Sequence, residues 1–189
     1  VLTGYMSTAS DGYDCWLLKT DLNGDSLWFN SFGRSANDQP TGIVQTADGG
    51  YMVVGKTKSY GAGDDDIWIV RADENGDSVW TTFFGTSSNE LDPSITETYD
   101  GNYLIASSST NPATSNYDPY FVKMSPAGDT LWSGFVTYDR SVSVRAVTEV
   151  SDHGYMFTGS ASYGYPDGSQ VFVSRLEPDF DTVWSTFVG

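Results

Sequence analysis

The sequence repeats itself every 52 residues, and this period restricts the chain to a repeat architecture. Several columns of residues keep the register together, which coincidence does not explain. The columns are tryptophan at Trp28, Trp80, Trp132 and Trp184; an aromatic at Trp16, Trp68, Tyr120 and Phe172; tyrosine at Tyr51, Tyr103 and Tyr155; a base at Lys19, Arg71, Lys123 and Arg175; and aspartate at Asp25, Asp77, Asp129 and Asp181 and at Asp48, Asp100 and Asp152.

One repeat unit predicts four short antiparallel strands. Each run is short and alternating and is bounded by turn residues. A tight turn such as Tyr99-Asp100-Gly101-Asn102 joins the first two strands, and an Asn-Gly hairpin such as Asn23-Gly24 joins the last two. Four such strands in about 50 residues are typical of a β-propeller blade. In the unit 90–141 we expect strands at Pro93–Thr98, Tyr103–Ser108, Tyr120–Met124 and Thr130–Val136.

The predicted fold is therefore an all-β propeller with four-stranded antiparallel blades. Blades are expected over 38–89, 90–141 and 142–189, and a partial blade without its inner strand over 1–37, from Val1–Met6 onward. The last outer strand is expected at Thr182–Val188. An incomplete blade leaves an unpaired edge, which favours membership of a larger ring of seven or eight blades. Assembly of two copies into one ring, or closure of four blades alone, are the alternatives.

The repeated columns are interpreted as scaffold, because a catalytic group is seldom needed four times. A blade cannot bury both faces alone, so flat Trp and other aromatic side chains suit blade-to-blade stacking. The basic column is expected to pair with Gln45, Glu97 and Glu149 on the first strands.

The charge balance is strongly acidic, with 25 Asp and Glu against 9 Lys and Arg. Such a surface disfavours nucleic acid and anionic membrane as partners. No apolar run is long enough to span a bilayer, and the start at Val1 suggests a processed or trimmed product. A single cysteine, Cys15, and a single histidine, His153, argue against a disulfide or a conventional zinc site.

The residues Asp48-Gly49-Gly50-Tyr51 followed by Asp66-Ile67-Trp68 and Asp73-Glu74-Asn75-Gly76-Asp77-Ser78-Val79-Trp80 form a pattern. This pattern resembles the extracellular propeller repeats of bacterial and archaeal surface proteins over nearly the whole chain. The resemblance implies an extracellular or cell-surface location and no particular activity. A more distant similarity to quinoprotein propellers concerns only Asp73, Gly76 and Trp80, which implies docking between blades and no quinone. The spacing of the sialidase Asp-box does not fit.

The turns Asp21-Leu22-Asn23-Gly24-Asp25 and Asp73-Glu74-Asn75-Gly76-Asp77 look like calcium loops. The third and fourth copies, beginning at Ser125 and Glu177, lose the oxygen ligands while keeping the loop length. A hairpin turn explains all four copies, so no cofactor is predicted and calcium stays the minor alternative.

The candidate ligand site lies in the variable loops between the second and third strands, since function concentrates on loops held by a rigid scaffold. Aromatic faces stack on sugars and carboxylates bind hydroxyls, so a glycan or protein ligand is expected there. The candidate residues are Tyr60, Asp64, Asp65 and Asp66 in one loop and Tyr163, Tyr165 and Asp167 in another. A solvated acidic loop without function is the competing interpretation.

For catalysis no residue is assigned. Asp64, Asp66, Glu90 and Asp92 are numerous enough to supply the acid pair of a glycosidase. His153 falls in a tight turn and is expected to be exposed, and Cys15 is expected to be a packed small hydrophobe. The predicted function is therefore a non-enzymatic binding or scaffold propeller. A carbohydrate-active hydrolase or lyase and a purely structural spacer remain as alternatives, and further blades or a second copy remain as partners.

Overall fold

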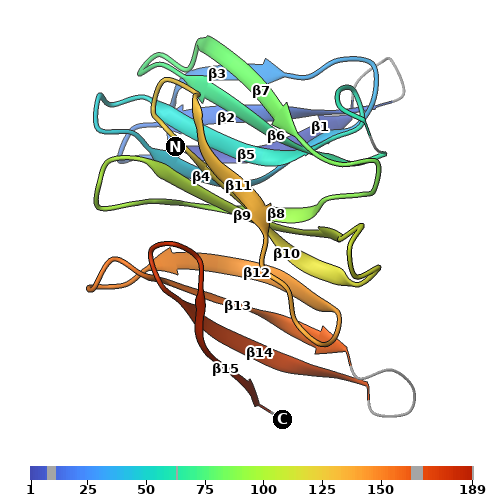
Figure 1. Cartoon of the computed structure of the whole chain (residues 1–189). Helices are drawn as coiled ribbons and strands as arrows, with labels where there is room; N and C mark the ends of the chain where they lie inside the picture. Colours follow the sequence, from blue (N-terminus) through green and yellow to red (C-terminus); the bar gives the residue numbers. More distant parts are fainter. Residues whose placement is uncertain (8–11, 63, 163–167, 189) are drawn as a thin grey trace. The chain divides into compact units, whose positions relative to one another are not determined.

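The computed structural model describes residues 1–7, 12–62, 64–162 and 168–188. This part of the chain contains β-strands and turns and no helix, so it has no helix able to cross a membrane (Figure 1). The chain forms two compact units, residues 1–89 and 90–189. Each unit contains two antiparallel sheets.

In the first unit, a three-stranded sheet is followed by a four-stranded one. The strand order in each sheet is the order in the sequence, so every connection is a turn or loop between neighbours. The first sheet consists of β1 (Leu2–Ser7), β2 (Tyr13–Thr20) and β3 (Ser26–Phe32), and the second of β4 (Asp38–Gln45), β5 (Tyr51–Thr57), β6 (Asp66–Ala72) and β7 (Ser78–Phe84).

The second unit repeats the four-stranded arrangement twice. One sheet consists of β8 (Leu91–Glu97), β9 (Tyr103–Thr110), β10 (Tyr117–Met124) and β11 (Thr130–Phe135), and the other of β12 (Val142–Glu149), β13 (Tyr155–Ser162), β14 (Ser169–Leu176) and β15 (Thr182–Val188). The predicted all-β fold of antiparallel propeller blades is confirmed: three sheets have four strands each, and the first sheet has three.

The strands are longer at the loop end than the sequence predicts. The predicted strand Tyr120–Met124 begins at Tyr117, because Asp118 and Pro119 pair with Ser109 and Ser108 of β9. β8 likewise begins at Leu91, before the expected Pro93. Polar residues at a strand end weaken the alternating pattern, so the pairing extends further than the pattern does.

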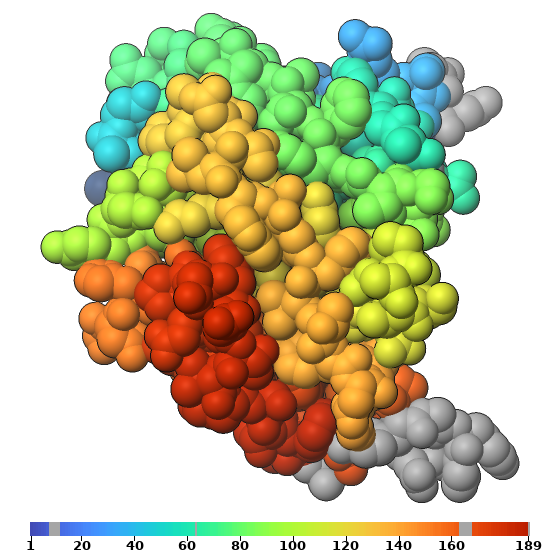
Figure 2. Space-filling model, in the orientation of Figure 1, coloured from blue at the N-terminus to red at the C-terminus, as the bar shows by residue number. Residues whose placement is uncertain are grey.

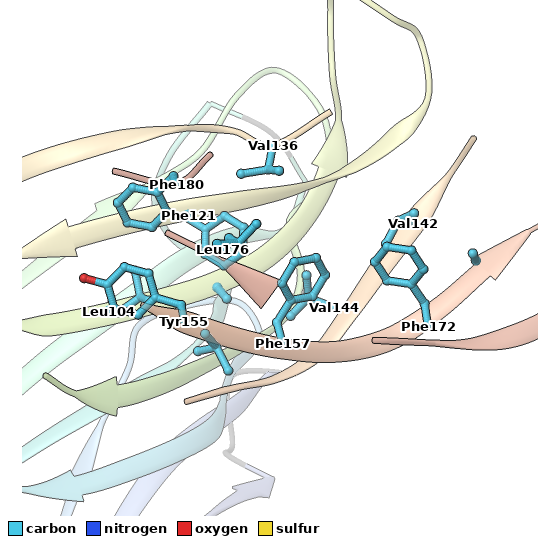
Figure 3. Close-up of a cluster of buried hydrophobic side chains, with 13 residues drawn as sticks. Leu104, Phe121, Val136, Val142, Val144, Tyr155, Phe157, Phe172, Leu176 and Phe180 are labelled. Carbon is cyan, nitrogen blue, oxygen red and sulfur yellow. The ribbon is translucent and has the colours of Figure 1, made fainter. Parts of the chain in front are cut away.

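The hydrophobic core of each unit lies between its sheets. In the first unit Leu17 of β2 and Val70 of β6 belong to one buried cluster. In the second unit Phe121, Phe157 and Phe172 belong to another, shown in Figure 3. The Phe121 and Phe157 rings meet edge to face with centroids 5.5 Å apart.

The Trp column packs on hairpin turns, as the sequence interpretation requires. A Cβ built on Gly76 would lie 2.6 Å from the Trp28 ring, so only glycine fits beneath that indole. In the second unit Trp132 stacks flat on Phe180, with centroids 3.9 Å apart and planes 7° apart. The same column therefore holds neighbouring sheets together in both units.

The expected pairing of the basic column was wrong. Arg71, Lys123 and Arg175 pair with the turn residues Asp48 (2.5 Å), Asp100 (2.8 Å) and Asp152 (2.7 Å), not with Gln45, Glu97 or Glu149. The turn aspartate and the base are 23 residues apart in each of the three four-stranded sheets. Each base on the third strand thus fastens the turn that joins the first two strands of the same sheet.

Candidate functional site

The three acids of the β5–β6 loop have different surroundings. Asp64 is exposed, whereas Asp65 is half-buried, lies 3.6 Å from the Lys58 ammonium and has its backbone N–H bound by the Asn89 amide oxygen at 3.2 Å. Asp66 begins β6 and is fully buried, and its carboxylate accepts a hydrogen bond from the Ala62 N–H at 3.3 Å. Of the three predicted acids, only Asp64 and Asp65 can present a carboxylate to solvent.

Tyr60, from the same loop, is held in one position by its neighbours. Its ring stacks on Trp68 and Phe83, with centroids 6.5 and 5.9 Å apart. The Arg34 guanidinium lies over the same ring at 4.8 Å from its centroid. Trp68 and Phe83 are paired across β6 and β7, so Tyr60 bridges two strands of its sheet.

A pocket of about 270 Å³ opens beside Tyr60. Its lining combines the aromatic residues Phe32, Tyr60 and Trp68 with the hydroxyl-bearing residues Ser31, Ser78 and Thr81, and Gly33 and Val70 complete it. The Trp68 indole N–H donates to the Thr81 hydroxyl at 2.7 Å, which in turn donates to the Ile69 carbonyl at 3.0 Å. The pocket thus combines aromatic side chains with hydroxyl-bearing residues, a mixture found in small-molecule sites.

Behind Gly33 lies a pair of carboxylates that sequence reasoning did not identify. A Cβ built on Gly33 would lie 2.3 Å from Asp14 Oδ1 and 3.0 Å from Asp38 Oδ2, so both carboxylates approach this glycine. Burial, together with the nearby Asp38 charge, raises the pKa of Asp14 above its ordinary value. Asp14 Oδ1 is buried and has no hydrogen-bond partner among the described residues.

Asp38, by contrast, is fully buried and well bonded. Its carboxylate accepts hydrogen bonds from the Thr57 hydroxyl, the Ser59 hydroxyl (2.8 Å) and the Arg34 N–H (2.8 Å). The register gave a signal for these acids: Asp14, Asp66 and Asp118 are 52 residues apart, as are Asp38 and Glu90. The signal was missed because an acid at a strand end usually indicates a solvated loop.

The other acids considered for catalysis are divided between the interior and the surface. Glu90 is fully buried and accepts a hydrogen bond from the Ser109 hydroxyl at 2.7 Å. Asp92 forms an exposed ion pair with Arg145 at 2.7 Å. These two acids therefore differ in burial and partners, and each has an evident structural role.

The calcium-like turns are hairpin turns capped by their own side chains. Asp21 Oδ1 accepts the N–H groups of Asn23 (2.8 Å) and Asp25 (2.9 Å), and Asp73 Oδ1 does the same for Asn75 and Asp77. These hydrogen bonds lower the pKa of Asp21. Within the described residues, no group of three His, Cys, Asp or Glu side chains is placed to hold a metal ion.

His153 is half-exposed and has partners. It replaces the glycine of the equivalent turns Gly49 and Gly101 and shares their positive φ (65°, against 87° and 75°). Its ring lies 4.4 Å from that of Tyr99, and its Nδ1 lies 3.4 Å from the Glu149 carboxylate, which also accepts the Tyr99 N–H. His153 therefore links two neighbouring turns of the second unit.

The remaining predicted residues divide into two groups. Cys15 is fully buried beside Leu17, as expected, and burial raises the pKa of its thiol to about 12. Tyr163, Tyr165 and Asp167 lie outside the described residues.

No protein-family model matches the sequence, and no curated protein matches it. Among solved structures, the chain is similar to a protein of unknown function from Bacteroides caccae, with 12% identity over 95% of this chain and 76% of that one and a TM-score of 0.47. It is also similar to BBS1N, crystallised in complex with ARL6DN, with 12% identity over 98% of this chain and 66% of that one and a TM-score of 0.45.

Proposed function

We propose that the chain is a non-enzymatic binding propeller that takes a neutral sugar unit of a glycan at the β5–β6 loop. The observation that supports this most is the pocket of about 270 Å³ lined by the aromatic residues Phe32, Tyr60 and Trp68 and by three hydroxyl-bearing residues. Aromatic side chains and hydroxyl groups are typical of protein sites that take a pyranose. In line with the repeat pattern, the proposed setting is a secreted or cell-surface protein.

Tyr60 supports the proposal because its position is fixed before any ligand arrives. Trp68 and Phe83 stack on the ring, and the Arg34 guanidinium lies over it. A wall that needs no ordering loses less entropy when it binds. The exposed Asp64 carboxylate follows Tyr60 in the same loop and is the natural acceptor for sugar hydroxyls.

The small volume favours one sugar ring over an extended chain, since ligand pockets usually range from about 300 to 1,000 Å³. Further sugar units of a glycan would then extend out of the pocket. The acidic surface favours neutral sugars over sulfated or phosphorylated ones, because like charges repel.

The test is a glycan array with the full chain, followed by titration of the best neutral glycan by calorimetry. We expect Asp64→Asn to weaken binding about tenfold, since a hydrogen bond to a charged group contributes roughly 1.5 kcal/mol. Tyr60→Ala removes a pocket wall and should abolish detectable binding. Glu74→Gln, which makes the same change of charge just after the other end of β6, is the matched control and should bind as wild type.

Unchanged affinity in Asp64→Asn and Tyr60→Ala would reject this site. An array and pull-downs that stay empty would favour a structural spacer. Turnover of a polysaccharide that vanishes in Asp64→Asn would make the chain a carbohydrate-active enzyme.

A further inference from the structure

Neighbouring sheets within each unit pack in the same sense. In the first unit Leu17 of β2 shares a buried cluster with Val53 of β5 and Val70 of β6. In the second unit Phe121 of β10 shares one with Phe157 of β13. Leu17 and Phe121 occupy one column of the repeat. We call the side of a sheet that carries this column its tail face, and the opposite side its head face. In each unit, the tail face of one sheet packs on the head face of the sheet that follows.

The fourth sheet has an exposed tail face. Val171 is 54% exposed, although the same column is buried at Cys15 and Pro119. Val188 is 57% exposed, although Val136 in the same column is buried. Figure 2 shows the C-terminal strand, in red, at the surface of the molecule.

The first sheet has an exposed head face. Leu2 is 56% exposed and pairs across the sheet with Leu18. In the other sheets, the residues that pair with the Leu18 column are Val53, Ile105 and Phe157, and all three are buried. The first sheet thus exposes apolar side chains that the later sheets bury.

Exposure of this kind is not a general property of the outer strands. One column, consisting of Leu27, Val79, Leu131 and Val183, is at least half exposed in all four sheets. The Val171 column behaves differently, and so do the residues that pair with the Leu18 column: each set is exposed in a single sheet. These two residues therefore mark half-interfaces rather than ordinary surface.

The tryptophan column gives the same result independently. Trp28 covers Gly76 and Trp132 covers Phe180, each in the turn of the next sheet. Trp184, at the same register in the fourth sheet, is 44% exposed. The corresponding turn of the first sheet is open, with no atom within 4 Å of a Cβ built on Gly24.

We propose that these two faces bind each other between two copies of the chain, head to tail. The tail face of one copy supplies Val171, Trp184 and Val188, and the head face of the second supplies Leu2 and the Gly24 turn. The template is the packing seen twice within the chain, Leu17 on Val70 and Phe121 on Phe157. The contact joins two different surfaces, so it is heterologous. It does not depend on sugar binding at the β5–β6 loop.

Net charge opposes this association and gives it a signature. Each copy carries a formal charge of −16, so two copies repel each other at low ionic strength. Salt screens that repulsion while leaving apolar burial intact. Association should therefore become stronger as salt rises, which is opposite to the behaviour of a contact held by ion pairs.

The test is sedimentation velocity on the full chain over a range of concentrations. Wild type should associate, and Leu2→Arg or Val171→Arg should each weaken association at least tenfold. Mixed in equal amounts, the two variants should associate with each other, because each keeps one intact face. Val79→Arg and Leu131→Arg, from the column that is always exposed, are the matched controls and should associate as wild type.

Near-UV circular dichroism checks that each variant is folded. We expect native spectra, because the Leu2 and Val171 side chains are already exposed. A wild type that remains monomeric at all concentrations would overturn the proposal. Failure of the mixture to associate would also overturn it, because a symmetric contact would not be restored by mixing. Loss of sugar binding in these variants is not expected, so the two proposals fail separately.

Discussion

Single residues in the turns show how packing offsets backbone strain. The fourth position of the β14–β15 turn is Phe180, with φ of 72°, where the other hairpins have Gly24, Gly76 and Gly128. A left-handed conformation costs a residue with a side chain roughly 1–2 kcal/mol. Phe180 stacks on Trp132 and on Tyr155, with centroids 3.9 and 5.1 Å apart, and this burial offsets the cost.

Asp14 stands in surroundings that disfavour its own charge. Its carboxylate approaches Asp38 at Gly33, and burial and the Asp38 charge raise its pKa. A raised carboxyl pKa means that the native state loses stability as pH rises through that pKa. In the fourth sheet the same position is Gln170, which carries no charge.

Asp14→Asn should therefore stabilise the protein at neutral pH, because it removes a charge whose buried Oδ1 has no hydrogen-bond partner among the described residues. A buried polar group left unpaired costs roughly 1–3 kcal/mol, so a gain of about 1 kcal/mol is expected. The gain should disappear near pH 3, where the wild-type carboxyl is protonated. Urea unfolding at pH 7 and at pH 3 measures both values. A variant less stable than wild type at pH 7 would show that the Asp14 charge has a partner after all.

At the scale of elements, the ion pairs of the basic column fasten each first turn to the third strand. Lys123 of β10 binds Asp100 in the β8–β9 turn, and its ammonium also lies 3.1 Å from the Tyr155 hydroxyl of β13. Burial alone would raise the pKa of Asp100, but hydrogen bonds from Lys123, Thr98 and Asn102 outweigh it and lower that pKa. Lys123 thus joins the β8–β9 turn to β10 and to β13 of the neighbouring sheet.

Asp100→Asn should lower the melting temperature at pH 7 and have little effect at low pH. A carboxyl group whose pKa is lowered on folding stabilises the folded state fully at pH values above its unfolded-state pKa, which is near 3.9. This stabilisation is lost as the pH falls through the folded-state pKa. Because Asp100 is half exposed, the loss should be below about 1 kcal/mol. Asp129→Asn, the same change in the next turn of the sheet, is the control. Equal effects of Asp100→Asn at pH 7 and pH 2 would contradict an electrostatic role.

At the scale of the whole molecule, much of the fold follows from the 52-residue register alone. Trp28, Trp132 and the turn glycines predicted the sheets and their stacking, because packing between copies repeats with the sequence. The partners of Arg71 and Lys123 were not predictable, since several acids lie within reach of a long side chain. The Asp14–Asp38 approach was likewise missed, because it joins residues of two sheets around one glycine.

The candidate site was predicted only in outline. The loop containing Tyr60 and Asp64 was identified because it varies between copies, while the burial of Asp66 depends on where β6 begins. The pocket itself combines Phe32 of the first sheet with Trp68 of the second. Such a combination depends on packing between sheets, which spacing along the chain does not specify.

Cys15 offers a chemical measure of the stability of residues 1–89. Its thiol is fully buried in the cluster with Leu17 and Val70, and burial raises its pKa to about 12. Both access and the thiolate form are needed for reaction with a disulfide reagent. The native thiol should therefore react at pH 8 only when the surrounding sheets open.

Leu17→Ala should accelerate this labelling by roughly thirtyfold or more, because a buried Leu→Ala change costs about 2–5 kcal/mol and labelling follows the open population. Leu131→Ala, an exposed residue of the same type, should leave the rate unchanged. The measurement is the rate of thiol release at pH 8, compared with the rate in 6 M urea. Cys15 lies on the tail face of the first sheet, which packs against β6. If the wild-type labelling rate without urea equalled the rate in 6 M urea, Cys15 would be accessible and β2 and β6 would not be packed together.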